Sequence, residues 1–331
     1  MALYVNTNVT SLRGQSSLNK ATNSLATTYN RLSTGLRINS AKDDAAGLQI
    51  SDRLTSQING LTQGNRNSND AIALTQTVEG AMDEMTTMLQ RIRTLAVQSA
   101  NGTNTTTDRQ SIQAEVTALS KEITRIASKT TYGGKKILSS FGKADSVVAD
   151  GTNKQVNFQV GANQNDVLRL DMSLKGKDGK VADKKDFSLK SLMEVMGGNV
   201  TGTIDYEGKN KTAYATVTGD KSDIESKTSY AVWNVSNSAS AQATLGAIDD
   251  VINLIDTKRG DFGALENRLS STISNQTNVA NNESDARSRI RDTDYAEEAS
   301  NLSAQSIVQQ AASSMLTQAN SLPQLALSLL G

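Results

Sequence analysis

The sequence contains no cysteine and no histidine, and it has a single proline among its 331 residues. Without thiol or imidazole groups the chain can form no disulfide, and it can offer neither thiolate nor imidazole ligands to a zinc ion. The serine-histidine-aspartate arrangement of many hydrolases is excluded as well, because it needs an imidazole as its general base. We therefore expect no metal centre, no cofactor and no enzymatic activity, although carboxylate chemistry stays formally open.

Aromatic residues are also scarce, at 4% of the chain, and no charge sign is in excess: lysine plus arginine and aspartate plus glutamate both number 34. A chain without an overall positive field lacks the attraction that nucleic acids and anionic membranes usually exert on their protein partners. With few aromatics, a core must be built from aliphatic side chains and alanine along extended helices. Pro323, the one proline, leaves those helices uninterrupted.

The first residues, MALYVNTNVTSLRG, show neither a basic n-region nor a long apolar h-region, so the sequence predicts no cleaved secretory signal. The longest strongly apolar tract, around Leu325 to Leu330, is far too short to span a bilayer. Taken alone, these two observations predict a cytoplasmic protein.

Both ends of the chain carry a seven-residue repeat that predicts helices with a narrow contact face. The residues between the repeated leucines are mainly Ala, Ser, Thr and Gln, which permit close approach but supply little apolar area, at roughly 25 cal/mol per Å². Such helices are marginal alone and are expected to order only against each other or against other copies. The leucines of this predicted assembly seam are Leu18, Leu25, Leu32, Leu302 and Leu316.

Between the terminal helices the pattern predicts a long helix from Asp43 to about Ser99, started by a capping box formed by Ser40 and Asp43. A second capping box, Thr107 with Gln110, predicts the start of the next helix. Each of these two helices carries one apolar stripe, and a third stripe marks a partner helix beyond the middle of the chain. The stripe residues recur at steps of three, four or seven. Three such stripes indicate a helical bundle. The stripes are Thr75, Val78, Met82, Met85, Leu89, Ile92 and Ala96; Ile112, Val116, Leu119, Ile123 and Ile126; and Ile248, Ile255, Phe262 and Leu269.

The middle of the chain changes to strand-like alternation. Val156, Phe158 and Val160 alternate before a GANQND turn, and the return strand over Val167 to Met172 completes a predicted β-hairpin. From Ser173 a Lys/Asp-rich loop leads to a short predicted helix at Leu189 to Met196, followed by three strand-like segments, VTGTIDY, TAYATV and SYAVWNV.

The expected fold is therefore mainly α: a long helical coiled-coil or bundle rod formed by both chain ends, with a β-hairpin and a small inserted α+β surface domain. We expect three domains. Residues 1–42 and 287–331 form a terminal coiled-coil inner core, residues 43–172 and 237–286 form a helical outer core with the hairpin, and residues 173–236 form the inserted variable domain.

Three blocks of this sequence resemble bacterial flagellin, the subunit of the flagellar filament. They are LSTGLRINSAKDDAAGLQISDRL near the start, LQRIRTLAVQSANGTN at Leu89 to Asn104, and the ending SMLTQANSLPQLALSLLG. The resemblance covers both ends of the chain and not the middle, as expected of a family with a variable outer region. It implies a secreted structural subunit that polymerises into the extracellular helical filament for motility.

The resemblance also implies a route and a set of partners. Flagellins leave the cell through the flagellar type III export channel without a cleaved signal, which overrides the cytoplasmic prediction. The implied partners are other subunits of the homopolymer, a filament cap, hook-filament junction proteins and an export chaperone that holds the C-terminal helix. Neither nucleic acid nor membrane is among them.

A further implied partner is the vertebrate Toll-like receptor that senses flagellin. In the flagellins that this receptor recognises, the residues matching Arg91, Leu95 and Glu115 form the recognised patch. Arg91 and Leu95 are expected to point away from the seam that Leu89 and Ile92 form. This chain departs from the commonest pattern at Thr94, where a glutamate is usual.

Two alternatives share some of these features. A flagellin-like hook-filament junction protein would have the same terminal helices but act as an adaptor in few copies; the strength of the first two blocks favours the filament subunit. A flagellin with an inserted zinc protease is the second alternative, and the absence of histidine excludes that version.

Overall fold

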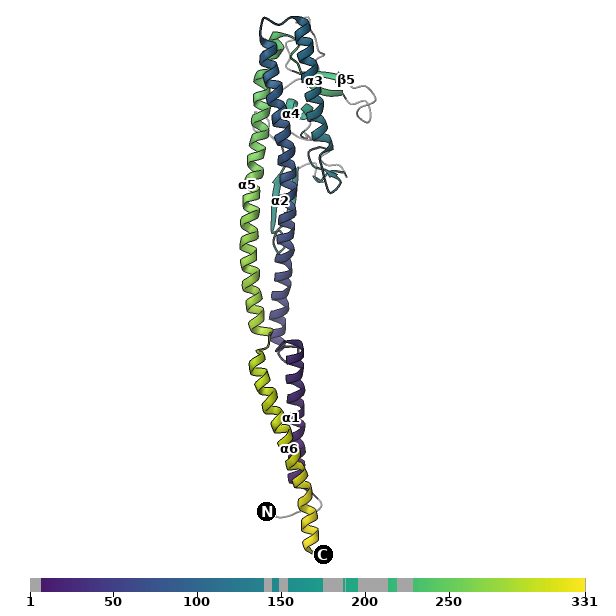
Figure 1. Cartoon of the computed structure of the whole chain (residues 1–331), viewed down its shortest axis with the longest axis vertical. Coiled ribbons are helices and arrows are strands. Elements are labelled where there is room, and N and C mark those ends of the chain that lie inside the picture. The colour runs from purple at the N-terminus through teal and green to yellow at the C-terminus, as the bar shows by residue number, and fades with distance from the viewer. Residues whose placement is uncertain are drawn as a thin grey trace. The chain divides into compact units, whose positions relative to one another are not determined.

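A computed structural model describes residues 7–139, 145–148, 154–174, 187, 189–195, 214–218 and 229–330 of the chain. It confirms the predicted mainly helical fold with short antiparallel strands (Figure 1). The chain forms two compact units, of which the first combines both ends of the chain and the second is one continuous stretch. Unit 1 comprises Met1–Gly60 with Asn278–Gly331, and unit 2 comprises Leu61–Thr277.

Unit 1 is built on two helices, α1 (Val9–Thr34) and α6 (Tyr295–Leu330). The side chain of Asn8 caps the start of α1 by accepting a hydrogen bond from the Ser11 amide. Gly35 ends the helix in the left-handed conformation, with φ of 71°, which a residue with a Cβ adopts only under strain.

The start of α2 (Ala45–Ala100) also lies in unit 1, and the predicted cap at Ser40 is wrong. The Asp43 carboxylate accepts hydrogen bonds from the Asn39 and Ser40 amides, closing a tight turn before the helix. These backbone donors hold the pKa of Asp43 below its ordinary value. The helix itself is capped by Asp44, whose Oδ1 accepts from the amides of residues 46 and 47. The Ser40 hydroxyl also donates to the Asp43 carboxylate, so these two side chains bond within the turn instead of capping a helix.

In unit 2 the remainder of α2 packs with α3 (Thr106–Lys129) and with α5 (Ser238–Arg291). Ion pairs fix the arrangement: Arg93 of α2 binds Asp249 of α5 at 2.7 Å, and Arg259 of α5 binds Asp83 of α2 at 2.9 Å. The order of these pairs makes α2 and α5 antiparallel. The predicted stripes are confirmed as core: all of the first and third are buried, as are Ile112, Val116 and Ile123 of the second, whereas Leu119 and Ile126 are half-buried.

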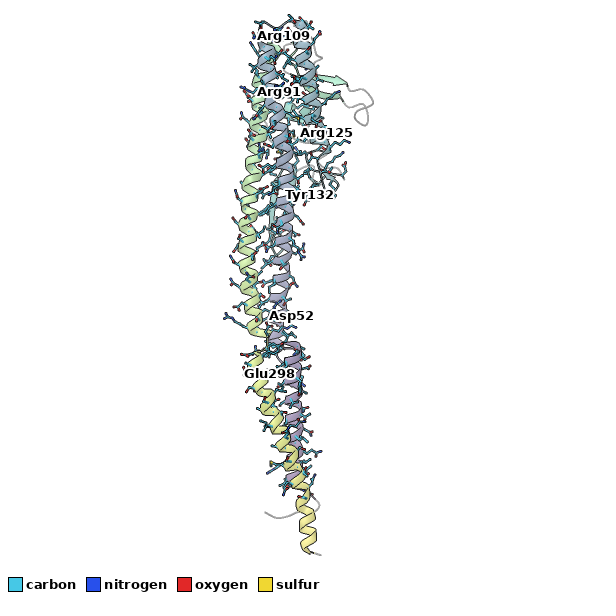
Figure 2. All side chains as sticks on the ribbon, in the orientation of Figure 1. Asp52, Arg91, Arg109, Arg125, Tyr132 and Glu298 are labelled. Carbon is cyan, nitrogen blue, oxygen red and sulfur yellow. The ribbon has the colours of Figure 1, made fainter. Side chains whose placement is uncertain are left out.

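The predicted cap of α3 at Thr107 is also wrong. Thr105 caps the helix, and its side chain exchanges hydrogen bonds with Asp108 in a complete capping box. At the α2–α3 connection Arg109 donates to the carbonyl groups of Ser99 and Asn101, which lie at the end of α2 (Figure 2). That guanidinium satisfies terminal carbonyls that the helix leaves without a partner.

In the part of the chain that the structure describes, six short strands form three antiparallel pairs. The predicted hairpin is confirmed as β3 (Gln155–Gln159) with β4 (Val167–Asp171), in a register that places Phe158 opposite Leu168. The other pairs are β1 (Thr131–Tyr132) with β2 (Lys135–Lys136), and β5 (Tyr214–Thr218) with β6 (Ser229–Trp233). The predicted short helix is α4 (Leu189–Val195). Of the remaining predicted segments, the Lys/Asp-rich loop over 175–186 and the strand-like VTGTIDY lie outside the described residues.

The described parts of residues 173–236 are continuous with the helical core rather than a separate layer. Gln113 of α3 is buried and bonds the backbone on both sides of residue 234, donating to the Trp233 carbonyl and accepting from the Val235 amide. Helix α2 joins this contact, since Ser99 Oγ donates to the Val235 carbonyl at 2.6 Å. The described residues near the two predicted boundaries, 172/173 and 236/237, therefore pack against the helices, and the boundaries themselves stay a prediction. The same cluster contains Leu174, Phe187, Leu192, Met193, Ala231, Trp233 and Val235.

Candidate assembly interface

The terminal helices α1 and α6 lie side by side in unit 1, where polar contacts set their direction (Figure 1). Asn8 at the start of α1 donates to the carbonyl of Ala319 at 2.7 Å, and near the other end Thr28 donates to Gln305 at 3.3 Å. The two helices are therefore antiparallel. In this structure the two terminal helices pack against each other within one chain.

The leucines of the predicted seam, Leu18, Leu25, Leu32, Leu302 and Leu316, are each half-buried. Four buried positions between the helices carry small side chains instead: Ala21 and Thr28 on α1, Ala312 and Ala319 on α6. Gly14 is half-buried, and a Cβ at that position would lie 3.2 Å from the Leu316 Cδ1 atom. The seam thus joins two backbones closely and leaves much of each leucine accessible.

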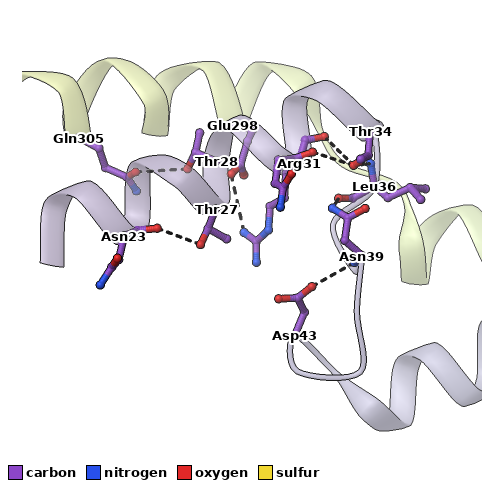
Figure 3. Close-up of polar contacts among 11 residues, drawn as sticks. Asn23, Thr27, Thr28, Arg31, Thr34, Leu36, Asn39, Asp43, Glu298 and Gln305 are labelled. Atoms are coloured by element: carbon purple, nitrogen blue, oxygen red, sulfur yellow. Dashed lines mark hydrogen bonds and ion pairs between the residues drawn. The ribbon is translucent and has the colours of Figure 1, made fainter. Parts of the chain in front are cut away.

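An ion pair lies at one end of the α1–α6 contact, near the segments that join α1 to α2 and α5 to α6. Arg31 of α1 lies 3.8 Å from Glu298 of α6, whose side chain is buried (Figure 3). Beyond it the two junction segments run together: the Arg37 amide donates to the Arg291 carbonyl at 2.7 Å, and the Thr293 amide donates to the Gly35 carbonyl at 3.0 Å. These backbone bonds tie the two junctions of unit 1 to each other.

An apolar groove of about 400 Å³ runs between α1 and α6. Its walls combine small residues with two large apolar side chains from α6, Val308 and Met315, which are 53% and 69% exposed. Large apolar groups grouped on a helix surface are typical of a protein-protein contact. The lining residues are Thr10, Arg13, Gly14, Ser17, Val308, Ala311, Ala312, Met315 and Ala319.

The sequence predicts the leucine seam but not this groove. The small residues Gly14, Ala21 and Thr28 recur every seven positions on α1, and Ala312 and Ala319 are seven positions apart on α6. That spacing is a sequence signal for close helix approach. Three of these residues, Gly14, Ala312 and Ala319, line the groove.

The three predicted receptor-contact residues lie together in unit 2, although not all at the surface. Arg91 of α2 binds Glu115 of α3 through both Nε and Nη2, at 2.9 and 2.7 Å, and both side chains are about half exposed (Figure 2). Leu95, however, is only 3% exposed and belongs to the core. The expectation that Leu95 points away from the seam is wrong, because α2 contacts both α3 and α5 and its buried face is wider than one stripe.

The chain matches known proteins along most of its length. Residues 5–142 match the family described as the bacterial flagellin N-terminal helical region, and residues 245–330 match its C-terminal helical region. Flagellin B of Vibrio cholerae is 38% identical over an alignment of 376 residues that covers all of both chains. This chain belongs to the bacterial flagellins. Polar flagellin C of Vibrio parahaemolyticus, also 38% identical, aligns along the whole of this flagellin as well.

Among solved structures, the flagellin resembles a putative flagellar hook-associated protein from Vibrio parahaemolyticus. The TM-score is 0.51 at 16% identity, and the match covers 76% of this chain and all of the other. Similarity at that level shows a shared fold and nothing of function. No described helix of the flagellin has a stretch both long and apolar enough to cross a lipid bilayer.

Proposed function

We propose that this flagellin polymerises through the α1–α6 groove of unit 1. Bacterial flagellins are structural proteins, and as a member of the family the chain is a subunit of the extracellular flagellar filament. The observation that supports the proposed contact is the groove itself, which exposes Val308 and Met315 beside a floor of small residues. Identity to flagellins along the whole chain favours this function over that of a hook-filament junction adaptor.

The geometry of the groove suggests how a subunit would add to the filament. A large apolar side chain from a second copy would bury the accessible surfaces of Val308 and Met315 in the groove. Burial of this area is worth roughly 25 cal/mol per Å². If the inserting surface differs from the groove, the contact is heterologous, and repetition that does not close gives a helical filament. Leu12 and Ile307, which are 58% and 67% exposed, are available for such contacts on the same helices.

The further partners follow from membership of the family and stay proposals. We propose export through the flagellar type III channel without a cleaved signal, insertion under a filament cap, attachment to hook-filament junction proteins, and protection of the C-terminal helix by an export chaperone. An exposed apolar surface on α6 fits a segment that needs a chaperone before assembly. Catalysis plays no part in this function.

Deletion of the chain from Asn301 onward tests the assembly contact. The truncated protein should remain folded, because the core of unit 2 lies wholly within Leu61–Thr277, but it should no longer sediment as filaments. Filaments formed by the truncated protein would contradict the assignment.

A charge placed in the groove gives a sharper test than the deletion. Val308→Glu should abolish polymerisation because it introduces an unpaired carboxylate into an apolar contact. Gln310→Glu adds the same charge on an exposed position of α6 that does not line the groove, and it should polymerise normally. Equal loss in both variants would show that charge on α6, rather than the groove, controls assembly.

We also propose that Arg91 and Glu115 are recognised by the flagellin-sensing Toll-like receptor. The support is their exposure and their juxtaposition across α2 and α3. Leu95 is buried, so Leu95→Ala would destabilise the core by about 2–5 kcal/mol and cannot report on recognition.

Signalling should fall for Arg91→Ala in a reporter-cell assay. Arg125→Ala is the matched control, since Arg125 is an exposed arginine that pairs with Glu122 on α3. Full activity of the Arg91 variant would contradict the proposal.

A further inference from the structure

We propose that Met315 is a site of reversible oxidation, and that its sulfoxide blocks assembly of the subunit. The chemical part of this inference depends only on the exposure of the thioether. The consequence for assembly rests on the proposed function of the groove. The experiments below separate the two parts.

Met315 differs from the other methionines that the structure describes. Its side chain is 69% exposed, whereas Met82 and Met85 are completely buried in the seam of α2. Oxidation by a dissolved oxidant requires contact with the sulfur, so a thioether on a helix surface reacts before one enclosed in a core. The remaining described methionines are Met88, which is half-buried, and Met172 and Met193, which are 1% and 0% exposed.

The position of Met315 gives its oxidation a consequence. The side chain lies in the wall of the apolar groove with Val308, and the opposite wall is formed by Gly14 and its neighbours on α1. Oxidation converts a flexible apolar side chain into a polar one with a strong acceptor oxygen. Among the described residues of the groove, Thr10, Arg13 and Ser17 are the only ones with a side-chain donor, and all three lie on α1. A partner covering Met315 would have to bury the new oxygen, which costs free energy unless it finds a donor.

The reaction is a two-electron oxygen transfer from a peroxide. The thioether sulfur attacks one oxygen of hydrogen peroxide, a sulfur-oxygen bond forms as the oxygen-oxygen bond breaks, and the second oxygen leaves as water after proton transfer. The sulfur is oxidised by two electrons and the peroxide is reduced by two. Methionine sulfoxide reductases, which act on each sulfoxide epimer, return the thioether.

Peptide mass spectrometry of the full-length monomer treated with hydrogen peroxide tests the chemical part. The peptide containing Met315 should gain one oxygen at least about tenfold faster than the peptide containing Met82 and Met85, in line with their exposures. The same treatment of assembled filaments should leave Met315 largely unmodified, because the proposed contact covers it. Equal rates in the monomer would overturn the assignment of the site.

A conservative variant tests the consequence for assembly. Met315→Leu keeps an apolar side chain of similar volume but cannot form a sulfoxide, so the polymerisation of each protein is compared with and without peroxide. Peroxide should reduce polymerisation of the parent at least about tenfold and leave polymerisation of the variant unaffected. A methionine sulfoxide reductase should restore polymerisation of the oxidised parent. Equal sensitivity of parent and variant would overturn the proposal. If Val308→Glu still polymerises while Met315 oxidises selectively, the proposed groove contact fails and the oxidation site stands.

Discussion

Two threonines at the α2–α3 connection show how single residues decide where a helix begins. Thr105 and Thr107 both precede the apolar stripe of α3, and each has an acceptor-bearing side chain three positions later. Thr105 faces Asp108, whose carboxylate can bond the Thr105 amide and hydroxyl at 2.9 and 2.7 Å. Because an ionised carboxylate accepts more strongly than an amide oxygen, the Thr105 box prevails over the one at Thr107. The same donors hold the pKa of Asp108 below its ordinary value.

Substitution of each threonine by alanine tests this assignment. Thr105→Ala should lower the free energy of unfolding by about 1 kcal/mol, since the helix loses its N-cap. Thr107→Ala should change it by less than about 0.5 kcal/mol, because Thr107 is exposed and its side chain caps nothing. Chemical denaturation of both variants measures the difference, and a larger loss in the Thr107 variant would restore the alternative cap.

Glu266 is a second position where one side chain matters. Burial raises the pKa of its carboxyl above the ordinary value of 4.5, and the nearby Glu79 carboxylate raises it further. Its Oε1 atom is enclosed without a hydrogen-bond partner among the described residues. The folded state therefore holds this proton more tightly than the unfolded chain. The resulting stability is fully present below the unfolded pKa and is lost as the pH rises through the folded pKa.

Glu266→Gln should consequently raise the thermal unfolding temperature at pH 7, where it removes the enclosed charge. The gain should shrink as the pH falls towards 4, because the parent carboxyl then becomes neutral too. Glu84→Gln, at an exposed position of the same bundle, is the control for a change in overall charge. A gain that did not depend on pH would contradict the titration of Glu266.

Among the elements, the β3–β4 hairpin depends on a close approach to α2. A Cβ placed on Gly64 would lie 1.8 Å from the Val160 carbonyl oxygen, so the hairpin can rest on the helix only where no side chain intervenes. Gln276 of α5 donates to the same carbonyl at 2.8 Å, and Asn67 of α2 donates to the Gln159 carbonyl at 2.8 Å. The hairpin end is thus held by both long helices of unit 2.

Gly64→Ala should therefore destabilise unit 2 by about 1–3 kcal/mol, because backbone must move to admit the methyl group. Gly80→Ala lies on the same helix, where a Cβ would meet nothing within 4 Å. That variant should gain about 0.5–1 kcal/mol from helix propensity. Denaturation measured for both variants distinguishes crowding at the hairpin from a general effect of glycine in α2; stabilisation by Gly64→Ala would contradict the contact.

At the scale of the whole molecule, the middle segment contributes to the main core. The sequence alone predicts that residues 173–236 form a separate surface unit, which could be replaced by a linker without effect on assembly. In the described part of this segment, Trp233 is completely buried and its neighbour Val235 bonds α2 and α3. The proposed assembly contacts on α1 and α6 contain none of these residues, and replacement by a linker stays a prediction.

Replacement of all of residues 173–236 by a glycine-serine linker should lower the stability of unit 2. Trp233→Ala should reproduce much of this loss, at about 3–5 kcal/mol. If the full replacement unfolded at the same denaturant concentration as the parent, the segment would be dispensable to the core.

The sequence by itself determined the helices, their apolar stripes, the hairpin and the family. These features depend on local spacing. A seven-residue step, as from Ile248 to Ile255, places two side chains on one face of a helix, and alternation at Val156 and Phe158 does the same on a strand. This holds whichever element packs against that face. Contiguous blocks at both ends of the sequence also sufficed for the match to bacterial flagellins.

Only the tertiary structure decided which of several locally acceptable options was used. Leu95 and Trp233 are buried because α2 and α3 each meet more than one partner, and a single stripe does not show the second partner. The caps at Asp44 and Thr105 prevailed because the carboxylates of Asp44 and Asp108 accept hydrogen bonds from nearby donors. The groove beside Met315 exists because small residues on two segments, distant in the sequence, come together there, and that approach is fixed by packing between elements.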